Sequence, residues 1–295
     1  MLLGLFLMLG ALTAPGPNTS FSGTPIQSVV RALRPVILKQ TAADQRFVLL
    51  RLINEARSQA GLSSLQWDER LAQAADEHAK IMSETGQLSH QFPAEPGLAD
   101  RLASRLRFEQ AGENVFYDIN VSGAHQAFME SPPHRDNILN GAYDSVGIGV
   151  VEGGGVLYIV EDFAHRVPEL NNEKAAERVA DQLIKVRQGA GAGRLKLVSD
   201  GRVQQMACSM AERESVSASS PFLPPGVRFA ASYATPDPDR LPADIARLAA
   251  GAGVRHFSVG ACYARTPKYP TGLYWISILL FQDSPALSLR EFHPF

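Results

Sequence analysis

Apolar residues recur at helical spacing in two segments of the first third of the chain. The first segment runs from Gln45 to Ala60 and is followed by Gly61, which stands where a helix commonly ends in a left-handed residue. The second begins after Asp68, a typical N-cap residue, and ends near Gly86. The residues that carry these two patterns are Phe47, Leu49, Leu50, Ile53 and Ala56 in the first segment, and Leu71, Ala74, Ala75, His78 and Met82 in the second. We therefore expect two amphipathic helices, and we expect His78 to be a hydrogen-bonded core residue.

The next segments predict a shorter helix and a β-hairpin. A third helix is expected over residues 123–130, where prolines at 132 and 133 stop it, and one more turn is expected over 134–139. Two β-runs, 146–151 and 156–163, are joined by three glycines, which is typical of a hairpin. Helices followed by a hairpin favour an α+β layered domain.

A domain boundary is expected near residue 170, where the chain becomes polar before a new helical pattern starts near Ala176. The sequence thus divides into a leader (1–16), a linker with an N-terminal helix (17–44), a first domain (45–168) and a second domain (175–295).

The second half repeats the first weakly. In one match Leu65, Asp68, Arg70, Leu71 and Ala75 correspond to Leu197, Asp200, Arg202, Val203 and Ala207, and in another Val146-Gly147 corresponds to Val259-Gly260. The matched residue numbers differ by fewer positions in the second match than in the first, so the second half has fewer residues between its two matching segments. The repeat is therefore expected to be smaller and degenerate, lacking the middle of the first domain. Chance similarity between two α+β segments is the alternative.

Composition and the N-terminus indicate the compartment. The first fourteen residues are apolar and are followed by Pro15, Gly16 and Pro17, which is typical of a secretory signal, so we expect a secreted or periplasmic protein. The alternative is a frayed apolar end on a cytosolic protein. No later stretch approaches the roughly 20 apolar residues that span a bilayer, so no stable membrane insertion is expected after cleavage. A net charge of -2 without any basic run argues against nucleic acid as a partner.

The chain has two cysteines, Cys208 and Cys262, both in the second half. Export would permit a disulfide between them, and two unpaired buried thiols are an equally good interpretation.

Candidate chemistry lies in three polar clusters that we expect in loops: 88–90 with His90, 112–114 with Glu113, and 131–139 with His134. Two imidazoles and a carboxylate suit a divalent metal with an open position, or a general acid-base pair. Surface-loop residues with no joint role are the alternative. Trp67 and Trp275 are expected to be packing anchors, and His256 a structural residue.

These clusters belong to a longer run of ordered motifs. Residues 46–166 resemble a bacterial member of the CAP superfamily, the cysteine-rich secretory, antigen and pathogenesis-related proteins, also called SCP domains. The matching motifs are Leu52-Ile53-Asn54-Glu55-Ala56-Arg57, Gly61-Leu62, Leu65-Gln66-Trp67-Asp68, His90, Gly112-Glu113-Asn114, Ser131 to Leu139, and Val146 to Val150.

The resemblance implies an α-β-α sandwich with a cleft lined by His90, His134 and Glu113. The histidine pair binds zinc in several members of the family, which makes His90 and His134 candidate metal ligands. Ser131 stands near the position of a second family carboxylate, so Glu130 is only a candidate for the cleft. The remaining candidates, expected to be supporting groups, are Asn114, Arg135 and Asn137.

Three functions are compatible with such a cleft. The first is binding of a small lipid or peptide ligand, with metal shaping the site. The second is a metal-dependent peptidase or esterase in which Glu113 activates a bound water, with His90 and His134 beside it. The third is an extracellular interaction scaffold in which the second domain docks on the first. The chain has no His-Glu-x-x-His run and no Gly-x-Ser-x-Gly elbow, which favours binding over catalysis and leaves enzyme status open. A carboxylate beside the imidazoles would keep both protonated at low pH, so metal binding should weaken as pH falls.

Overall fold

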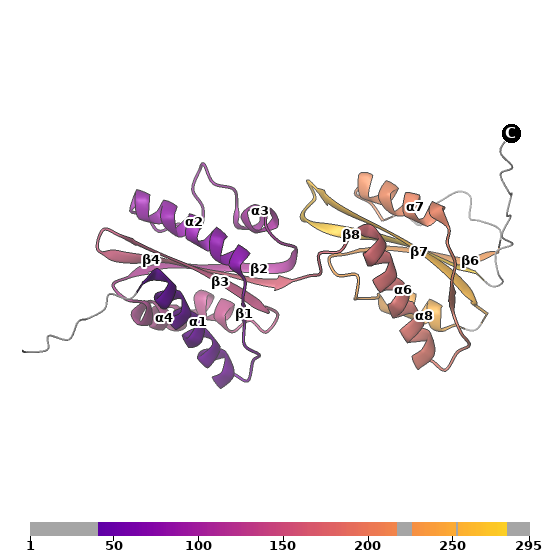
Figure 1. Ribbon diagram of the computed structural model, residues 1–295, viewed down its shortest axis with the longest axis horizontal. Coiled ribbons are helices and arrows are strands. Elements are labelled where there is room, and N and C mark those ends of the chain that lie inside the picture. The colour runs from indigo at the N-terminus through magenta and orange to yellow at the C-terminus, as the bar shows by residue number, and fades with distance from the viewer. Residues whose placement is uncertain (1–40, 217–225, 252, 282–295) are drawn as a thin grey trace, which may run out of the picture. The chain divides into compact units, whose positions relative to one another are not determined.

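The computed structural model describes residues 41–216, 226–251 and 253–281, and the leader and linker expected within residues 1–40 lie outside this range. The described chain forms two four-stranded sheets (Figure 1). We call residues 41–166 the N-terminal module and residues 171–281 the C-terminal module. The elements of the N-terminal module are α1 (Ala42–Gln59), β1 (Gln66–Trp67), α2 (Glu69–Thr85), α3 (Leu98–Ala103), β2 (Phe108–Asp118), α4 (Val121–Glu130), α5 (Pro132–Ile138), β3 (Ser145–Gly153) and β4 (Val156–Arg166).

The N-terminal module is an α-β-α sandwich. Its sheet has the order β1-β3-β4-β2, with β1 parallel to β3 and the other pairs antiparallel. Helices α2 and α3 lie on one face and α1 and α4 on the other (Figure 1). Successive residues of β4 alternate between the two cores: Ile159 packs in the α1 and α4 layer, and Val160 packs against α2.

The expected helices and hairpin are confirmed. Thr41 and Asp44 form a capping box at the start of α1, Asp68 caps α2 through its side chain, and Gly86 ends α2 in the left-handed region. Helix α3 and strand β2 have no counterpart among the elements expected from sequence. β2 is the important omission, because it is the edge strand that carries residues 112–114.

The C-terminal module is a second α+β sandwich of the same topology. Its elements are α6 (Asn172–Gly189), β5 (Lys196–Leu197), α7 (Gly201–Glu212), β6 (Val227–Thr235), α8 (Ala243–Ala250), β7 (His256–Thr266) and β8 (Tyr269–Phe281). The sheet order is β5-β7-β8-β6, again with the short first strand parallel to its neighbour. Helices α6 and α8 cover one face and α7 the other (Figure 1).

Strand pairing shifts one of the residue matches drawn from sequence, that of Leu65, by two positions, whereas the match of Asp68 with Asp200 holds because both residues cap their helices. Gln66 pairs with Ser145, and Lys196 pairs with His256, so Lys196 is the structural counterpart of Gln66. The buried Leu65 therefore corresponds to the buried Leu195, and Leu197 is 49% exposed. The sequence match failed here because two extra residues separate β5 from the N-cap of α7.

The glycine match depends on the element compared. The strand register makes Gly149 the counterpart of Gly260, whereas the contact of Gly260 with Val203 and Gln204 of α7 corresponds to the contact of Gly147 with Leu71 and Ala72 of α2, as the sequence match expected. A Cβ added at Gly149 or at Gly260 would lie 2.4 or 2.3 Å from a backbone carbon of the helix above it. Both glycines are thus required by the close approach of a helix to the sheet.

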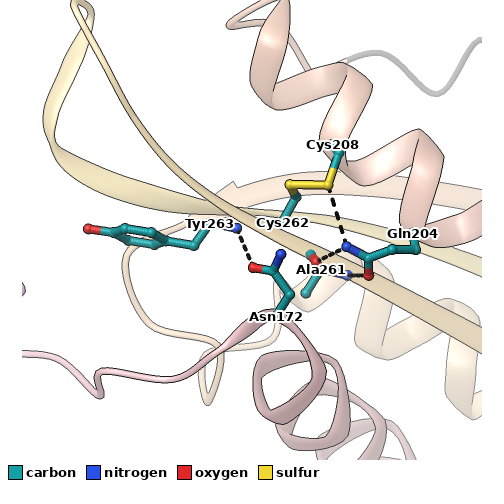
Figure 2. Close-up of a disulfide and its surroundings, with 6 residues drawn as sticks. All are labelled: Asn172, Gln204, Cys208, Ala261, Cys262 and Tyr263. Carbon is teal, nitrogen blue, oxygen red and sulfur yellow. Dashed lines mark hydrogen bonds between the residues drawn. A yellow bond between two sulfur atoms is a disulfide. The ribbon is translucent and has the colours of Figure 1, made fainter.

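A disulfide joins Cys208 of α7 to Cys262 of β7 and so staples the helix to the sheet (Figure 2). Gln204, one turn before Cys208, donates a hydrogen bond to the carbonyl of Ala261 at 2.7 Å. Of the two interpretations of the cysteines, the structure shows the paired one.

Candidate functional site

The three polar clusters meet at the free edge of the N-terminal sheet. Residues 112–114 lie in the middle of the edge strand β2, not in a loop as expected from sequence. The sequence prediction was wrong because Gly112, Glu113 and Asn114 interrupt the apolar alternation that marks a strand, although their side chains are largely buried. The loop after α2 and the short helix α5 bring the two histidines to this strand.

Glu113 is the centre of the site on the α2 and α3 side of the sheet. One carboxylate oxygen lies 2.9 Å from Nδ1 of His90, and the other accepts a hydrogen bond from the guanidinium of Arg101 in α3. The side chain of Glu113 is 2% exposed, whereas that of His90 is 60% exposed. Glu113 is therefore a buried, fully partnered carboxylate that orients an accessible imidazole.

His78 is a buried histidine that contacts the loop carrying His90. Its Nδ1 lies 2.8 Å from Oε2 of Glu95, and its Nε2 donates to the carbonyl of Ser89, the residue before His90. Nε2 also lies 3.9 Å from the carboxylate of Glu113. His78 is a buried, hydrogen-bonded residue as expected, and it also anchors the loop that carries His90.

Two asparagines tie α5 to the other side of β2. The side-chain amide of Asn114 donates to the backbone carbonyl of His134 at 3.1 Å. The amide of Asn137 donates to Oδ1 of Asn114 at 2.9 Å and to the carbonyl of Glu113 at 3.2 Å. These bonds fix the helix turn that carries His134 against the edge strand, so Asn114 and Asn137 are positioning residues.

The two site imidazoles have opposite electrostatic environments. The hydrogen bond that His90 donates to Glu113 raises the pKa of His90 above its ordinary value. Burial lowers the pKa of His134, and the positive charge of nearby His90 lowers it further. The pKa of His90 thus shifts in the direction expected for an imidazole beside a carboxylate, and the pKa of His134 shifts in the opposite direction.

Two buried carboxyl groups of β4 stand next to the site in the sheet. Asp162 pairs with Glu113, and Glu161 pairs with Asn114. Burial raises the pKa of Glu161 to about 8. Burial, with the charge of Glu113, raises the pKa of Asp162 well above its ordinary value. Both are therefore neutral acids at acidic pH, and they were not singled out from sequence, although two acids within an apolar run are a signal of buried polar residues.

The C-terminal module shows that the fold does not need these polar groups. By the strand register, the counterparts of Glu113, Asn114, Glu161 and Asp162 are Ala230, Ala231, Ile278 and Leu279. The same topology is thus built with apolar residues at all four positions. Since burying polar groups costs stability, their presence in the N-terminal module indicates a role other than folding.

The remaining sequence candidates lie beside the site. Glu130 is exposed and accepts a hydrogen bond from Gln126 of its own helix. Arg135 donates to the carbonyl of Met129 at 3.3 Å. A direct role for either side chain stays a prediction.

The site does not fit a zinc centre with three protein ligands. Among the described residues, no three His, Cys, Asp or Glu side chains are grouped as metal ligands. The carboxylate that would join the two histidines is Glu113, and both its oxygens are engaged by Arg101 and His90. Glu113 is therefore not available as a third metal ligand in this arrangement.

Comparison with known proteins agrees with this geometry. Residues 50–163 match the family model described as CAP, the Cysteine-rich secretory protein family. The N-terminal module is a CAP domain. The matched segment includes α2, β2, α5 and β3, the elements that assemble the site.

Several known proteins are similar to part of this chain. The chain is 34% identical over 113 residues to the uncharacterized membrane protein YlbC of Bacillus subtilis (strain 168), covering 38% of this chain and 32% of YlbC. It is 32% identical over 110 residues to the uncharacterized protein YkwD of the same strain, covering 37% of this chain and 43% of YkwD. A solved extracellular protein containing a SCP domain, from Bacillus anthracis str. Ames, shares 30% identity with a TM-score of 0.41, covering 45% of this chain and 44% of that one. The chain thus spans less than half of each of these relatives.

Proposed function

We propose that this chain is an exported CAP-domain protein that binds a small lipid or peptide ligand at His90 and His134, through a carboxylate or carbonyl oxygen of the ligand. One observation carries the proposal. Glu113 is buried and both its oxygens have partners, so the imidazoles are the groups of the site that remain open to a ligand.

The two imidazoles can act together as hydrogen-bond donors. His90 uses Nδ1 for Glu113, which leaves Nε2 to donate, and the raised pKa of His90 favours its cationic form. Because the pKa of His134 is lowered, its ring stays neutral down to a lower pH than the ring of His90 does. A cation beside a neutral donor suits an anionic or strongly polar oxygen, which a fatty acid and a peptide C-terminus both provide.

Hydrolysis is less well supported. A general base must be free to take a proton from water, and Glu113 would first have to leave Arg101 or His90. The hydrolase hypothesis predicts that Glu113→Gln abolishes turnover of a peptide or ester. The scaffold hypothesis predicts that a chain ending at residue 170 exposes an apolar surface, and a monodisperse truncation with unchanged ligand binding would contradict it.

The disulfide supports the export part of the proposal. Disulfides persist in oxidising compartments and are rare in reducing ones. The Cys208–Cys262 bond is independent of the leader and of the family resemblance, since it lies in the C-terminal module. None of the described helices combines the length and the hydrophobicity that a membrane crossing requires.

The proposal is tested by NMR of the protein labelled at its histidine rings. The chain has seven histidines, so the five outside the site serve as internal controls. Titration with oleate, and separately with trialanine, should shift the ring signals of His90 and His134 and leave the others in place. His90→Gln and His134→Gln should each weaken binding of the probe that shifts the signals. If neither probe moves these two rings, or if the variants bind equally well, the proposed site is wrong.

Zinc is a separate question, tested by calorimetry on the metal-stripped protein. We expect no stoichiometric tight binding at neutral pH, because two imidazoles without a third ligand bind weakly. Tight binding that disappears in both His90→Ala and His134→Ala would show that Glu113 or another group rearranges to complete a centre.

A further inference from the structure

The C-terminal module contains a basic cavity between the end of α6 and the start of β7. The cavity has a volume of about 630 Å³. A second hollow of about 490 Å³ adjoins it and shares Arg194 and Lys196 in its wall. The charged and titratable residues that line the larger cavity are Arg187, Arg194, Lys196, Arg255 and His256, and no acidic residue lines either hollow.

Three of these cations lack ion-pair partners in the described part of the chain. Arg194, Lys196 and Arg255 are exposed, and no carboxylate of the described residues lies within salt-bridge distance of them. Some other basic residues of the module are paired, among them Arg202 with Asp200 at 2.8 Å. Three uncompensated positive charges around one hollow create a field that attracts anions.

His256 also lines the larger cavity. Its Nδ1 is a buried atom without a hydrogen-bond partner among the described residues, so this atom does not face the open space of the cavity. The exposed cations of Arg194, Lys196 and Arg255 are therefore the groups that a ligand would meet first.

The N-terminal module shows that this charge is not a requirement of the fold. By the strand register, the counterparts of Arg194, Lys196, Arg255 and His256 are Ser64, Gln66, Asp144 and Ser145. A carboxylate oxygen of Asp144 there lies 3.2 Å from Nδ1 of His165, and the other lies 3.5 Å from Nε of Arg166. The same corner of the fold is thus neutral to acidic in one module and basic in the other.

Arg187 contributes to the cavity as a fixed wall rather than as a free cation. Its guanidinium donates to the backbone carbonyls of Gly193, Ala249 and Val254, among others, and the residue is 5% exposed. It thereby holds the loop that carries Arg194 against the start of β7, where Arg255 and His256 lie. The cavity is therefore a built feature of the module.

We propose that this cavity is a binding site for a phosphate-type oxyanion, either free or as the headgroup of a lipid. Guanidinium groups match the oxygens of a phosphate in pairs, and the ammonium of Lys196 supplies a further point charge. The site is distinct from the imidazole site of the CAP domain and does not depend on the function proposed for it.

The test is calorimetric titration of the full, oxidised chain with inorganic pyrophosphate at pH 7 and low salt. We expect saturable binding that weakens with added NaCl because exposed charges are screened. The triple variant Arg194→Gln, Lys196→Gln, Arg255→Gln should lose at least about tenfold in affinity. A matched triple variant, Lys185→Gln, Arg213→Gln, Arg247→Gln, removes the same charge from exposed positions of the module that do not line the cavity, and should retain the affinity.

Absence of pyrophosphate binding, or an equal loss in both triple variants, would overturn the proposal, since the second result would reflect net charge alone. Equal thermal melting of the variants and the parent confirms that both fold. Co-sedimentation with vesicles of phosphatidylglycerol and phosphatidylcholine then identifies the source. If the parent and the control variant sediment with the vesicles and the cavity variant does not, the ligand is a lipid headgroup. If the parent binds pyrophosphate but does not sediment with the vesicles, the ligand is a free anion.

Discussion

Arg57 and Arg187 make the same set of hydrogen bonds in the two modules. Each lies near the end of the first helix of its module and donates from Nε to the carbonyl six residues later, Ser63 at 2.8 Å or Gly193 at 2.7 Å. Each then donates from both terminal nitrogens to three carbonyls of the segment that precedes the central strand. Both arginines are buried, so these bonds organise a loop whose carbonyls would otherwise lack partners.

Replacing either arginine should therefore destabilise its own module. Arg57→Met and Arg187→Met leave several buried carbonyls unsatisfied, and we expect each to lower the free energy of unfolding by about 3 kcal/mol or more. Urea unfolding checks this, because Trp67 reports on one module and Trp275 on the other.

Arg51→Met is the matched control for Arg57→Met. Arg51 lies on the same helix, is exposed, and pairs only with Glu55. We expect it to cost about 0.5 kcal/mol or less. Similar losses for Arg51→Met and Arg57→Met would contradict the role given to the buried guanidinium.

The stability of the CAP domain should fall as pH rises toward 8 because of Glu161. Its pKa is raised to about 8 in the folded protein from an ordinary 4.5, so the folded state keeps a proton that the unfolded state has released. Stability is full below pH 4.5 and is lost as pH rises, by about 1.4 kcal/mol per pH unit for one proton. Glu161→Gln, which can still accept the bond from Asn114, should reduce this slope in urea unfolding at pH 5 to 8. Parallel curves for the two proteins would show that Glu161 ionises freely.

The two site histidines should titrate apart. NMR of the ring nitrogens should give His90 a pKa above 6.5 and His134 a pKa below it. Glu113→Gln should lower the pKa of His90, because the neutral amide no longer favours the imidazolium, and should leave the distant His125 unchanged. Binding of a carboxylate ligand should weaken as pH rises through the pKa of His90. A His90 pKa that Glu113→Gln does not lower would argue against the contact.

Reduction of the disulfide should affect one module alone. The bond joins residues separated by 54 positions, and a loop of that length predicts a loss of about 4 kcal/mol on reduction or in Cys208→Ser. The Trp275 transition should move to lower urea, and the Trp67 transition should not. Movement of both transitions would show that the modules unfold as one unit.

The elements that sequence predicts well are those whose apolar spacing is unbroken. Helices α1, α2 and α4 and the β3-β4 hairpin have such spacing, with caps at Asp68 and Gly86 that mark their ends. Strand β2 has polar residues at its centre, so the rule that finds strands by their apolar alternation fails there. The CAP motifs named His90, Glu113 and His134 as candidates without indicating what surrounds them.

The partners of the site come from long-range contacts that no local pattern encodes. Arg101 reaches Glu113 from a six-residue helix, and Glu95 reaches His78 from an irregular loop. Neither residue has a sequence context that distinguishes it from surface charge. The basic cavity was missed for a similar reason, because Arg194 and Lys196 are far in sequence from Arg255 and meet it only through the parallel pairing of β5 with β7.

The placement of both cysteines after the CAP domain also determines the order in which the chain can mature. A chain synthesised from its N-terminus presents every residue of the β1-β3-β4-β2 sheet before either Cys208 or Cys262 has been made. The CAP domain can thus complete its core and its imidazole site before any oxidation takes place. A failure to form the disulfide would therefore disrupt the module that carries the basic cavity and leave the histidine site intact.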